Sequence, residues 1–278
     1  MQRQIIMSIL LITAITISGS GCIDRDSDAV KLQIAGSTTV LPIGEECARI
    51  FMEEHPGSRI DVSGGGSSHG IRAVAAGTVD IGCVSRDLKP SELKLYPDLM
   101  PHAIARDGIA VIVHPENPVG GLTLTQVQGI YAGTITNWKE VGGTDSSITV
   151  VSREAGSGTR GCFEQAVMMP IREEITGRAI IQDSNGKIRA TIAGDEHSIG
   201  FISIGYLNSE VKSLNLDGIE PTPENVVSGR YAVSRTLWMV TKGEPDADEQ
   251  AFLDFVLGCE GQEIVEKVGY IPVELLQP

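Results

Sequence analysis

The residues from Ser152 to Gly161, SREAGSGTRG, hold functional groups suited to binding an anion. The segment contains two arginines, two serines, a threonine and three glycines, and it follows the apolar run SITVV at 147–151. Guanidinium, hydroxyl and backbone N–H groups are all hydrogen-bond donors, and a guanidinium fork matches two oxygens of one oxyanion. Glycine lets the backbone approach a ligand closely. The segment therefore predicts an oxyanion site at the end of a strand.

Two earlier segments place glycines and hydroxyl residues between a strand-like run and a helix-like run in the same way. GSTTV follows 31–36, and GGGSSHG follows 59–63. Helix N-termini leave backbone N–H groups unpaired, and in α/β sheets ligands lie beyond the carboxyl ends of the strands. A serine or threonine at such a junction is also the usual N-cap. Three glycine-rich junctions together predict convergence on one anion.

Apolar runs alternate with segments of helical periodicity along the rest of the chain. Strands are expected at 31–36, 59–63, 79–85, 108–115, 147–152, 198–204 and 236–241. Helices are expected from Val40 up to HPG at 55–57, at 70–78, from about Thr159, and near 247–267. This alternation predicts βαβ units and a mainly parallel sheet.

The N-terminus has the layout of an export signal. Residues 1–21 contain one arginine, an apolar run from Ile5 to Ile17, and small residues before Cys22. The apolar run is too short to span a bilayer comfortably. Small residues before a cysteine resemble a lipoprotein processing site, which predicts a signal peptide at 1–21, lipidation of Cys22 and a polar tether at 22–30. An uncleaved membrane anchor is the alternative, and both interpretations place the protein outside the cytoplasm at a membrane.

Composition and charge restrict the classes of partner. The 278 residues are 41% hydrophobic and 21% charged, which is typical of a globular protein with one large domain or two ordinary ones. The formal net charge of −14 argues against nucleic acid, whose phosphates require a basic face. A small anion is compatible with this charge, because distant surface charges are screened within about 8 Å.

Four cysteines besides Cys22 are widely spaced: Cys47, Cys83, Cys162 and Cys259. They form no CxxC or Cys/His cluster, and the five histidines lack metal-ligand spacing, so neither a metal nor a cofactor is expected. Their apolar neighbours favour small core residues, and a disulfide between two of them stays open.

Seven successive segments resemble the phosphate-binding proteins of ABC transporters, in particular their shorter bacterial and archaeal branch. They are GSTTVLPI, GGGSSHGI, TVDIGCVSRDL, DGIAVIVHPENP, YAGTITNW, SREAGSGTRGCFE and SIGFISIGY, and the resemblance runs from about residue 32 to the C-terminus. It implies a type II periplasmic-binding-protein fold of class α/β. Two lobes, each a mainly parallel sheet flanked by helices, would close on one phosphate. A monomer without enzymatic activity would then deliver the phosphate to permease subunits in the membrane.

The resemblance also implies how the chain is divided between the lobes. Lobe I is expected at 31–107 and 234–278, and lobe II at 108–233, with crossings near 106–115 and 229–237. Two crossings form a hinge that closes over a ligand.

The expected phosphate ligands come from the three junctions, read together with the resemblance. They are Ser37, Thr38, Thr39, Ser67 and Ser68 from lobe I, and Arg153, Ser157, Gly158 and Thr159 from lobe II. Arg153 is the expected charge partner, with Glu154 as its orienting neighbour. Asn185 in DSNGKI is more typical of a turn than of a ligand.

Phosphate that retains a proton also needs a hydrogen-bond acceptor. In the longer branch of the resembling family an aspartate follows the strand that matches VDIGCVS. Here SRDL stands in that place, with Arg86 at the acceptor's position and Asp87 beside it. Asp107, at the expected lobe crossing, is an alternative acceptor. The identity of the acceptor affects selectivity for phosphate over sulfate, because sulfate has no proton to donate.

Other functions fit parts of the pattern. Sulfate, molybdate, tungstate or a phosphonate could occupy the same fold, and so could the ligand of a sensor or adhesin. GSSHG at 66–70 also matches the G-x-S-x-G elbow of serine hydrolases, with Ser68 as the nucleophile. Only two expected strands precede Ser68, however, and the adjoining His69 cannot reach back to its hydroxyl on a helix. The hydrolase is therefore the distant alternative.

Overall fold

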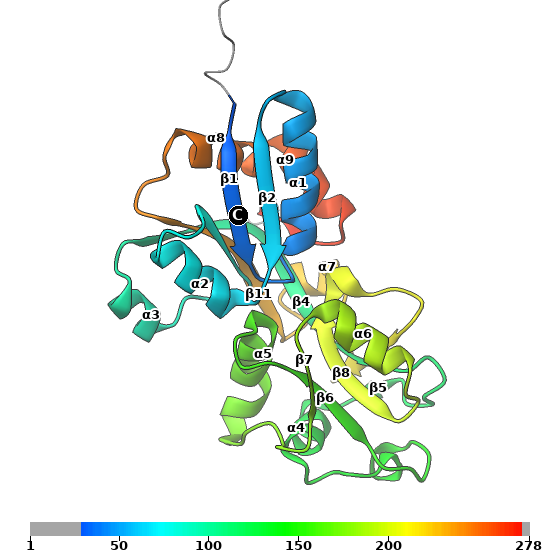
Figure 1. The fold of residues 1–278 in the computed structure, drawn as a ribbon. Helices are drawn as coiled ribbons and strands as arrows, with labels where there is room; N and C mark the ends of the chain where they lie inside the picture. Colours follow the sequence, from blue (N-terminus) through cyan, green and yellow to red (C-terminus); the bar gives the residue numbers. More distant parts are fainter. Residues whose placement is uncertain (1–28, 274–278) are drawn as a thin grey trace, which may run out of the picture.

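The computed structural model describes residues 29–273, which form two lobes (Figure 1). The N-terminal segments in blue and the C-terminal segments in orange and red share the upper lobe, and the middle of the chain, in green and yellow, forms the lower one. The predicted signal peptide, Cys22 and most of the predicted tether lie outside the described residues. None of the helices in 29–273 is long and apolar enough to cross a membrane.

The upper lobe, lobe I, is built on a sheet whose elements follow the predicted alternation. They are β1 (Lys31–Gly36), α1 (Leu41–Glu54), β2 (Arg59–Gly64), α2 (Ser67–Ala75), β3 (Ile81–Val84), α3 (Pro90–Leu95), β4 (Leu99–Val113), β11 (Ser234–Lys242), α8 (Ala247–Leu257) and α9 (Cys259–Lys267). The strand order is β2–β1–β3–β11–β4. β1 is parallel to β2 and β3, because α1 and α2 return the chain between them, whereas β11 runs antiparallel to β3 and β4.

The lower lobe, lobe II, continues the sheet in the order β4–β8–β6–β7. Its main elements are α4 (Leu124–Ala132), β6 (Thr149–Arg153), α5 (Gly158–Phe163), β7 (Ile180–Gln182), α6 (Asn185–Ala193), β8 (Ser198–Ser203) and α7 (Pro223–Val227). Shorter strands are β5 (Gly121–Leu122), β9 (Lys212–Ser213) and β10 (Asn215–Leu216). A further short strand, β12 (Ile271–Pro272), pairs with Ala105 and Arg106 in the lobe I part of β4. Short helical segments are η2 (Trp138–Val141), η3 (Glu164–Met168), η4 (Met169–Ile171) and η5 (Ile204–Tyr206). β6 is parallel to β7 and β8.

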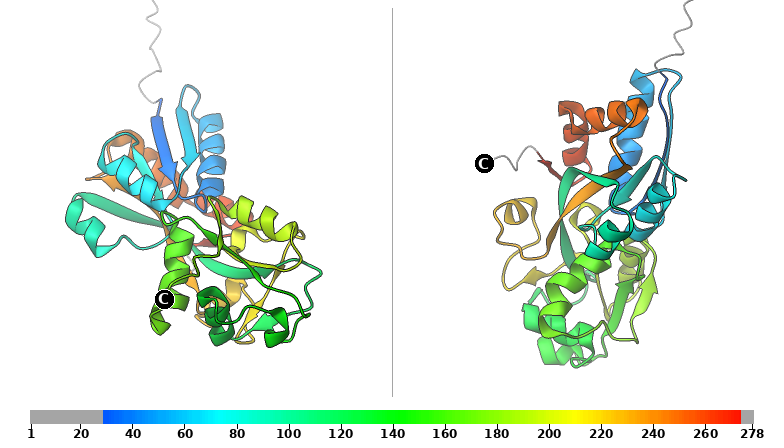
Figure 2. Two further views of the ribbon diagram at one scale, coloured as in Figure 1. Left: turned by 60° about the horizontal axis from the view of Figure 1, so that its bottom comes forward. Right: turned by 90° about the vertical axis from the view of Figure 1, so that its left-hand side faces the viewer.

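β4 and β11 connect the lobes and lie side by side between them (Figure 2, right). The first part of β4, Leu99–Gly108, pairs with β11, and the last part, Ile109–Val113, pairs with β8. This one long strand therefore carries the sheet from lobe I into lobe II. The sequence predicts only 108–115 as a strand here, because Pro101, His102 and Arg106 interrupt the apolar pattern that precedes it.

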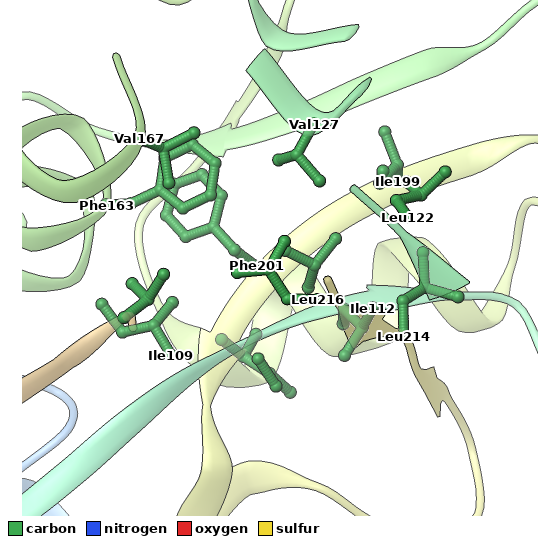
Figure 3. Packing of buried hydrophobic residues seen from close by; sticks show 14 of the residues in the cluster. Ile109, Ile112, Leu122, Val127, Phe163, Val167, Ile199, Phe201, Leu214 and Leu216 are labelled. Atoms are coloured by element: carbon green, nitrogen blue, oxygen red, sulfur yellow. The ribbon is translucent and has the colours of Figure 1, made fainter. Parts of the chain in front are cut away.

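Each lobe has its own hydrophobic core. One cluster runs from Val30 to Ala105 and from Leu237 to Tyr270, and the other runs from Ile109 to Val233 and includes Ile271. In the second cluster the rings of Phe163 and Phe201 stack 4.1 Å apart (Figure 3). Ile271 packs in the core of lobe II although the sequence assigns its segment to lobe I. The lobe boundaries at 107/108 and 233/234 stay a prediction.

The prediction of one C-terminal helix near 247–267 is wrong. α8 ends at Leu257, Gly258 is extended with φ −72° and ψ 171°, and α9 begins at Cys259. A Cβ atom on Gly261 would lie 2.3 Å from the carbonyl oxygen of Phe255, so glycine permits the close approach of α9 to the end of α8. The two short helices have a hydrophobic pattern that one long helix would also show.

The cysteines differ in environment. Cys47 and Cys83 are buried in the core of lobe I as predicted, and Cys162 is half-buried. Cys259 is exposed at the start of α9, so its interpretation as a core residue is wrong. Within residues 29–273 none of these four cysteines forms a disulfide. The residues from 29 to 273 place no three His, Cys, Asp or Glu side chains together as a metal site.

Candidate anion-binding site

Hydroxyl groups from three loops of lobe I bond one another. Ser37, which follows β1, donates through Oγ to Ser85 Oγ at 2.8 Å. Ser67, the first residue of α2, lies with its Oγ 3.3 Å from Ser85 Oγ and accepts a hydrogen bond from Ser85 N at 3.0 Å. All three serines are buried. Two of the predicted junctions therefore meet, and they are joined by Ser85, which the sequence pattern did not single out.

Gly158, the first residue of α5, brings lobe II against these hydroxyls. A Cβ atom at this position would lie 2.3 Å from Ser67 Oγ and 2.5 Å from Ser85 Oγ. Heavy atoms of this kind do not approach so closely, so any side chain would push the lobes apart. Only glycine therefore allows α5 to lie this close to the serines of lobe I. Ser157 precedes it as the N-cap of α5 and accepts a hydrogen bond from Arg160 N at 3.2 Å.

Further contacts join the lobes across the same region. Thr39 Oγ1 lies 3.1 Å from Thr159 Oγ1, and Asn185 Nδ2 donates to Thr39 Oγ1 at 3.0 Å. Ser68 N donates to the carbonyl oxygen of Gly156 at 3.1 Å. Thr39 and Ser68 belong to lobe I and the other three residues to lobe II, so the two lobes contact each other at the predicted site.

Arg153, the last residue of β6, enters this region with an unpaired donor. Its side chain is 1% exposed, and its Nε and Nη2 donate to Glu154 at 2.9 and 3.1 Å, as the sequence predicts for this neighbour. Nη2 also lies 3.0 Å from the carbonyl oxygen of Asp183 and 3.4 Å from Thr38 Oγ1. Nη1 is buried without a hydrogen-bond partner among the described residues. Because an unpaired buried donor is costly, this nitrogen is a candidate donor to an anionic ligand.

A buried ion pair at the hinge lies next to the threonines. Arg235 of β11 donates through Nε and Nη2 to Asp107 Oδ2 at 2.9 and 2.6 Å, and Ser203 Oγ donates to Asp107 Oδ1 at 2.8 Å. Burial raises the pKa of Asp107, while Arg235 and Ser203 act in the opposite direction. Both carboxylate oxygens already accept hydrogen bonds, so the contact of Asp107 with phosphate stays a prediction.

Arg235 also reaches residues of both lobes. Nη1 donates to Thr159 Oγ1 at 2.9 Å and to the carbonyl oxygen of Ser85 at 3.0 Å, and Nη2 donates to Thr39 Oγ1 at 3.1 Å. The side chain is 2% exposed. Arg235 lies in the predicted crossing segment 229–237, whose sequence contains no glycine and hydroxyl junction. Its role arises from strand register, which the sequence alone does not reveal.

Two comparisons identify the family to which this chain belongs. The family model described as PBP superfamily domain matches residues 24–260. The chain is 32% identical to the phosphate-binding protein PstS of Bacillus subtilis (strain 168), with 98% of this chain and 95% of that protein covered. The chain belongs to the PstS family within the PBP superfamily.

Solved structures of similar proteins agree with this assignment. A putative phosphate ABC transporter substrate-binding protein from Clostridium perfringens, determined with bound phosphate, is 44% identical with a TM-score of 0.84, and 87% of this chain and 99% of that chain are covered. An ABC-type phosphate transport receptor from Vibrio cholerae is 34% identical with a TM-score of 0.72, over 86% and 99% of the two chains. The two-lobed fold is therefore shared with other members of the PBP superfamily.

Arg86, one of the expected ligands, is bonded to other residues of lobe I. Its Nη1 and Nη2 donate to Glu92 at 2.8 and 2.7 Å, and Nη2 also donates to Ser68 Oγ at 3.2 Å. A guanidinium has donors and no acceptor, so Arg86 cannot accept a proton from phosphate. Asp87 beside it is exposed. The predicted contact of Arg86 with phosphate stays a prediction.

The structure brings most of the predicted site residues of this PstS-family chain together and adds four others. Those that lie together between the lobes are Ser37, Thr38, Thr39, Ser67, Arg153, Ser157, Gly158 and Thr159, with Asp107 connected through Arg235 and Ser68 through its backbone bond to Gly156. Those that the sequence pattern did not assign as ligands are Ser85, Asn185, Ser203 and Arg235. A hydroxyl or amide at a strand end or helix start could have indicated the first three.

Proposed function

We propose that this chain captures inorganic phosphate between its lobes, outside the cytoplasm, and delivers it to the permease subunits of an ABC transporter. The observation that supports this most directly is the buried Nη1 of Arg153, which has no partner in 29–273 and belongs to a guanidinium whose Nη2 reaches Thr38 Oγ1 of lobe I. The names of the B. subtilis and V. cholerae relatives, and the phosphate in the C. perfringens structure, agree with phosphate as the ligand.

The energetics of such a site are sufficient for tight binding. A hydrogen bond to a charged group contributes about 1.5–3 kcal/mol. Several such bonds, reduced by the costs of ordering and desolvation, readily leave the roughly −8 kcal/mol that corresponds to micromolar affinity. Arg153 and the first N–H groups of α5 would hold the anion from lobe II, and Thr38 and Ser67 would hold it from lobe I.

Calorimetric titration of the purified protein with phosphate, sulfate and molybdate near neutral pH tests this proposal. We expect phosphate to bind with micromolar or higher affinity, at least tenfold more tightly than either competitor. If sulfate or molybdate bound more tightly than phosphate, that anion would be the ligand in place of phosphate. Absence of binding to all three anions would overturn the assignment.

We also propose that residues 1–21 are removed on export and that a lipid on Cys22 holds the protein at the outer face of the membrane. The order of charged, apolar and small residues before Cys22 supports this. Mass spectrometry of the membrane-extracted protein checks it, with Cys22→Ser as the control variant. A diacylated N-terminal cysteine is expected in the unaltered chain, and an intact residue 1 would favour the uncleaved anchor.

We propose a monomeric binding protein without enzymatic activity, in line with the relatives named as binding proteins. The Oγ of Ser68, the nucleophile of the alternative hydrolase, accepts a hydrogen bond from Arg86, which Glu92 fixes in place. An assay with a generic ester should show no turnover. Hydrolysis that Ser68→Ala abolishes would instead support the hydrolase.

A further inference from the structure

We propose that Arg235 is the positioning residue of the anion site: it orients the threonine hydroxyls of both lobes as donors and couples them to the hinge. The proposal rests on the proposed function, because it assigns a role within the same site. Arg235 does not itself need to contact the anion, and it acts through Thr39 and Thr159.

The hydrogen bonds at Thr39 and Thr159 determine the direction in which each hydroxyl donates. A hydroxyl has one hydrogen and two lone pairs. Thr39 Oγ1 accepts from Arg235 Nη2 at 3.1 Å and from Asn185 Nδ2 at 3.0 Å, so its hydrogen must be donated to Thr159 Oγ1 at 3.1 Å. Thr159 Oγ1 accepts this bond and a second from Arg235 Nη1 at 2.9 Å. The hydrogen of Thr159 is left for a group outside the network.

A second hydroxyl chain in lobe I ends in the same way. Ser37 Oγ accepts from Thr39 N and donates to Ser85 Oγ. Ser85 Oγ also accepts from Arg235 Nη1 at 3.4 Å, so its own hydrogen is donated to Ser67 Oγ. Ser67 Oγ accepts this bond and another from Ser85 N, so its own hydrogen is also free. Arg235 therefore contacts this chain as well. Each chain therefore ends in a free O–H donor, Thr159 in one and Ser67 in the other, as a site for an anion requires.

Arg235 also lies at the hinge between the lobes. Arg235 sits on β11 directly opposite Asp107 on β4, and both strands pass between the lobes. Its guanidinium therefore contacts a lobe I residue, Thr39, and a lobe II residue, Thr159, from a position at the crossing. Separation of the lobes must break at least one of these bonds. We expect loss of Arg235 to accelerate dissociation of the anion more than it slows association.

Arg235→Lys tests positioning without removing the charge. A lysine ammonium can still pair with Asp107, but as a point charge on a flexible stem it cannot serve Thr39, Thr159 and the Ser85 carbonyl together. We expect the thermal midpoint of the phosphate-free protein to stay close to that of the unaltered chain. The phosphate Kd should rise at least tenfold, mainly through the dissociation rate measured by stopped-flow fluorescence.

A double variant separates positioning from charge neutralisation. Arg235→Met alone leaves Asp107 buried and unpaired, so it could fail to fold, whereas Asp107→Asn with Arg235→Met removes both charges together. We expect the double variant to keep the weakened phosphate binding of Arg235→Lys. Arg106→Met is the control: this half-buried arginine on β4 lines, with Arg235, a pocket of about 690 Å³ and should leave the phosphate Kd unchanged.

The outcomes distinguish the two proposals. If the unaltered protein binds phosphate and either Arg235 variant binds it equally well, the positioning role is wrong. Recovery of full affinity in the double variant would mean that Arg235 only neutralises Asp107, which also overturns the inference. If the unaltered protein itself does not bind phosphate, the proposed function fails first.

Discussion

Arg235 and Asp107 form a buried ion pair at the point where β11 and β4 pass from one lobe to the other, and they lie directly opposite each other in the strand register. The carboxylate is fully buried and is bonded on its other side by Ser203 of β8. The pair thus joins both connecting strands to a strand of lobe II. A buried ion pair of this kind adds little net stability, because the cost of desolvating both charges offsets their attraction. Removal of only one partner is nevertheless costly, because it leaves the other charge buried and unpaired.

Asp107→Ala should destabilise the fold strongly, because it leaves the guanidinium of Arg235 buried without its carboxylate. Removing one partner of a buried ion pair costs about 3–5 kcal/mol in the free energy of unfolding. Urea denaturation followed by circular dichroism measures this loss. Asp145→Ala is the control, because Asp145 pairs with Lys139 where both side chains are more than half exposed, and it should change the free energy of unfolding far less. Equal losses in the two variants would contradict the prediction.

Arg153→Met should weaken phosphate binding at least tenfold while both lobes stay folded. The change removes the unpaired Nη1 donor, and a charged hydrogen bond of about 1.5–3 kcal/mol corresponds to roughly ten- to hundredfold in Kd. Isothermal titration calorimetry with phosphate measures the effect. Arg178→Met, at an exposed position of lobe II, is the matched control and should bind as the unaltered chain does. Unchanged affinity of Arg153→Met would remove Arg153 from the site.

The sequence predicts the glycine and hydroxyl junctions well because their chemistry is local. Each junction contains within a few residues both the strand end and the helix start that fix its position, as at Ser67 and at Gly158. The positions of most strands follow for the same reason. The break at Gly258 was missed because α8 and α9 together maintain one helical hydrophobic pattern.

Arg235 and Ser85 could not be predicted in the same way. The guanidinium of Arg235 reaches Thr39, which is 196 positions away, only because β11 pairs with β4 in one register. A shift of that register by one residue would turn the side chain to the other face of the sheet. The sequence pattern likewise does not reveal that the carboxylate of Glu92, in the first turn of α3, accepts hydrogen bonds from Arg86.

Gly158→Ala should abolish tight phosphate binding without unfolding either lobe. The added methyl group would collide with Ser67 Oγ and Ser85 Oγ, so the lobes could not reach the arrangement in which their donors meet. We expect a phosphate Kd at least tenfold higher and little change in the thermal midpoint without ligand. Gly120→Ala is the control, because a Cβ atom there meets nothing within 4 Å. Normal binding by Gly158→Ala would show that the lobes close differently.

The ion pair between Arg86 and Glu92 should give lobe I a stability that depends on pH. Glu92 is 17% exposed; burial raises its pKa, but hydrogen bonds from Arg86 and from Lys89 N lower it more, and the net pKa lies below the ordinary 4.5. An acid whose pKa is lowered by folding stabilises the folded state above its unfolded pKa. That contribution is lost as the pH falls through the folded pKa, because the folded chain then binds the same proton that the unfolded chain already holds.

Glu92→Gln should therefore be less stable than the unaltered chain at pH 7, by about 1 kcal/mol in the free energy of unfolding. The difference should begin to shrink as the pH falls below 4.5, the ordinary pKa, and should vanish below the lower pKa of folded Glu92, where the folded carboxylate is neutral as well. Urea denaturation at a series of pH values measures both curves, and the other carboxylates cancel in the difference. Glu173→Gln, a change at an exposed acid of lobe II, should give no difference at any pH. A gap between Glu92→Gln and the unaltered chain that stays constant down to pH 3 would mean that the charge of Glu92 contributes nothing to holding Arg86.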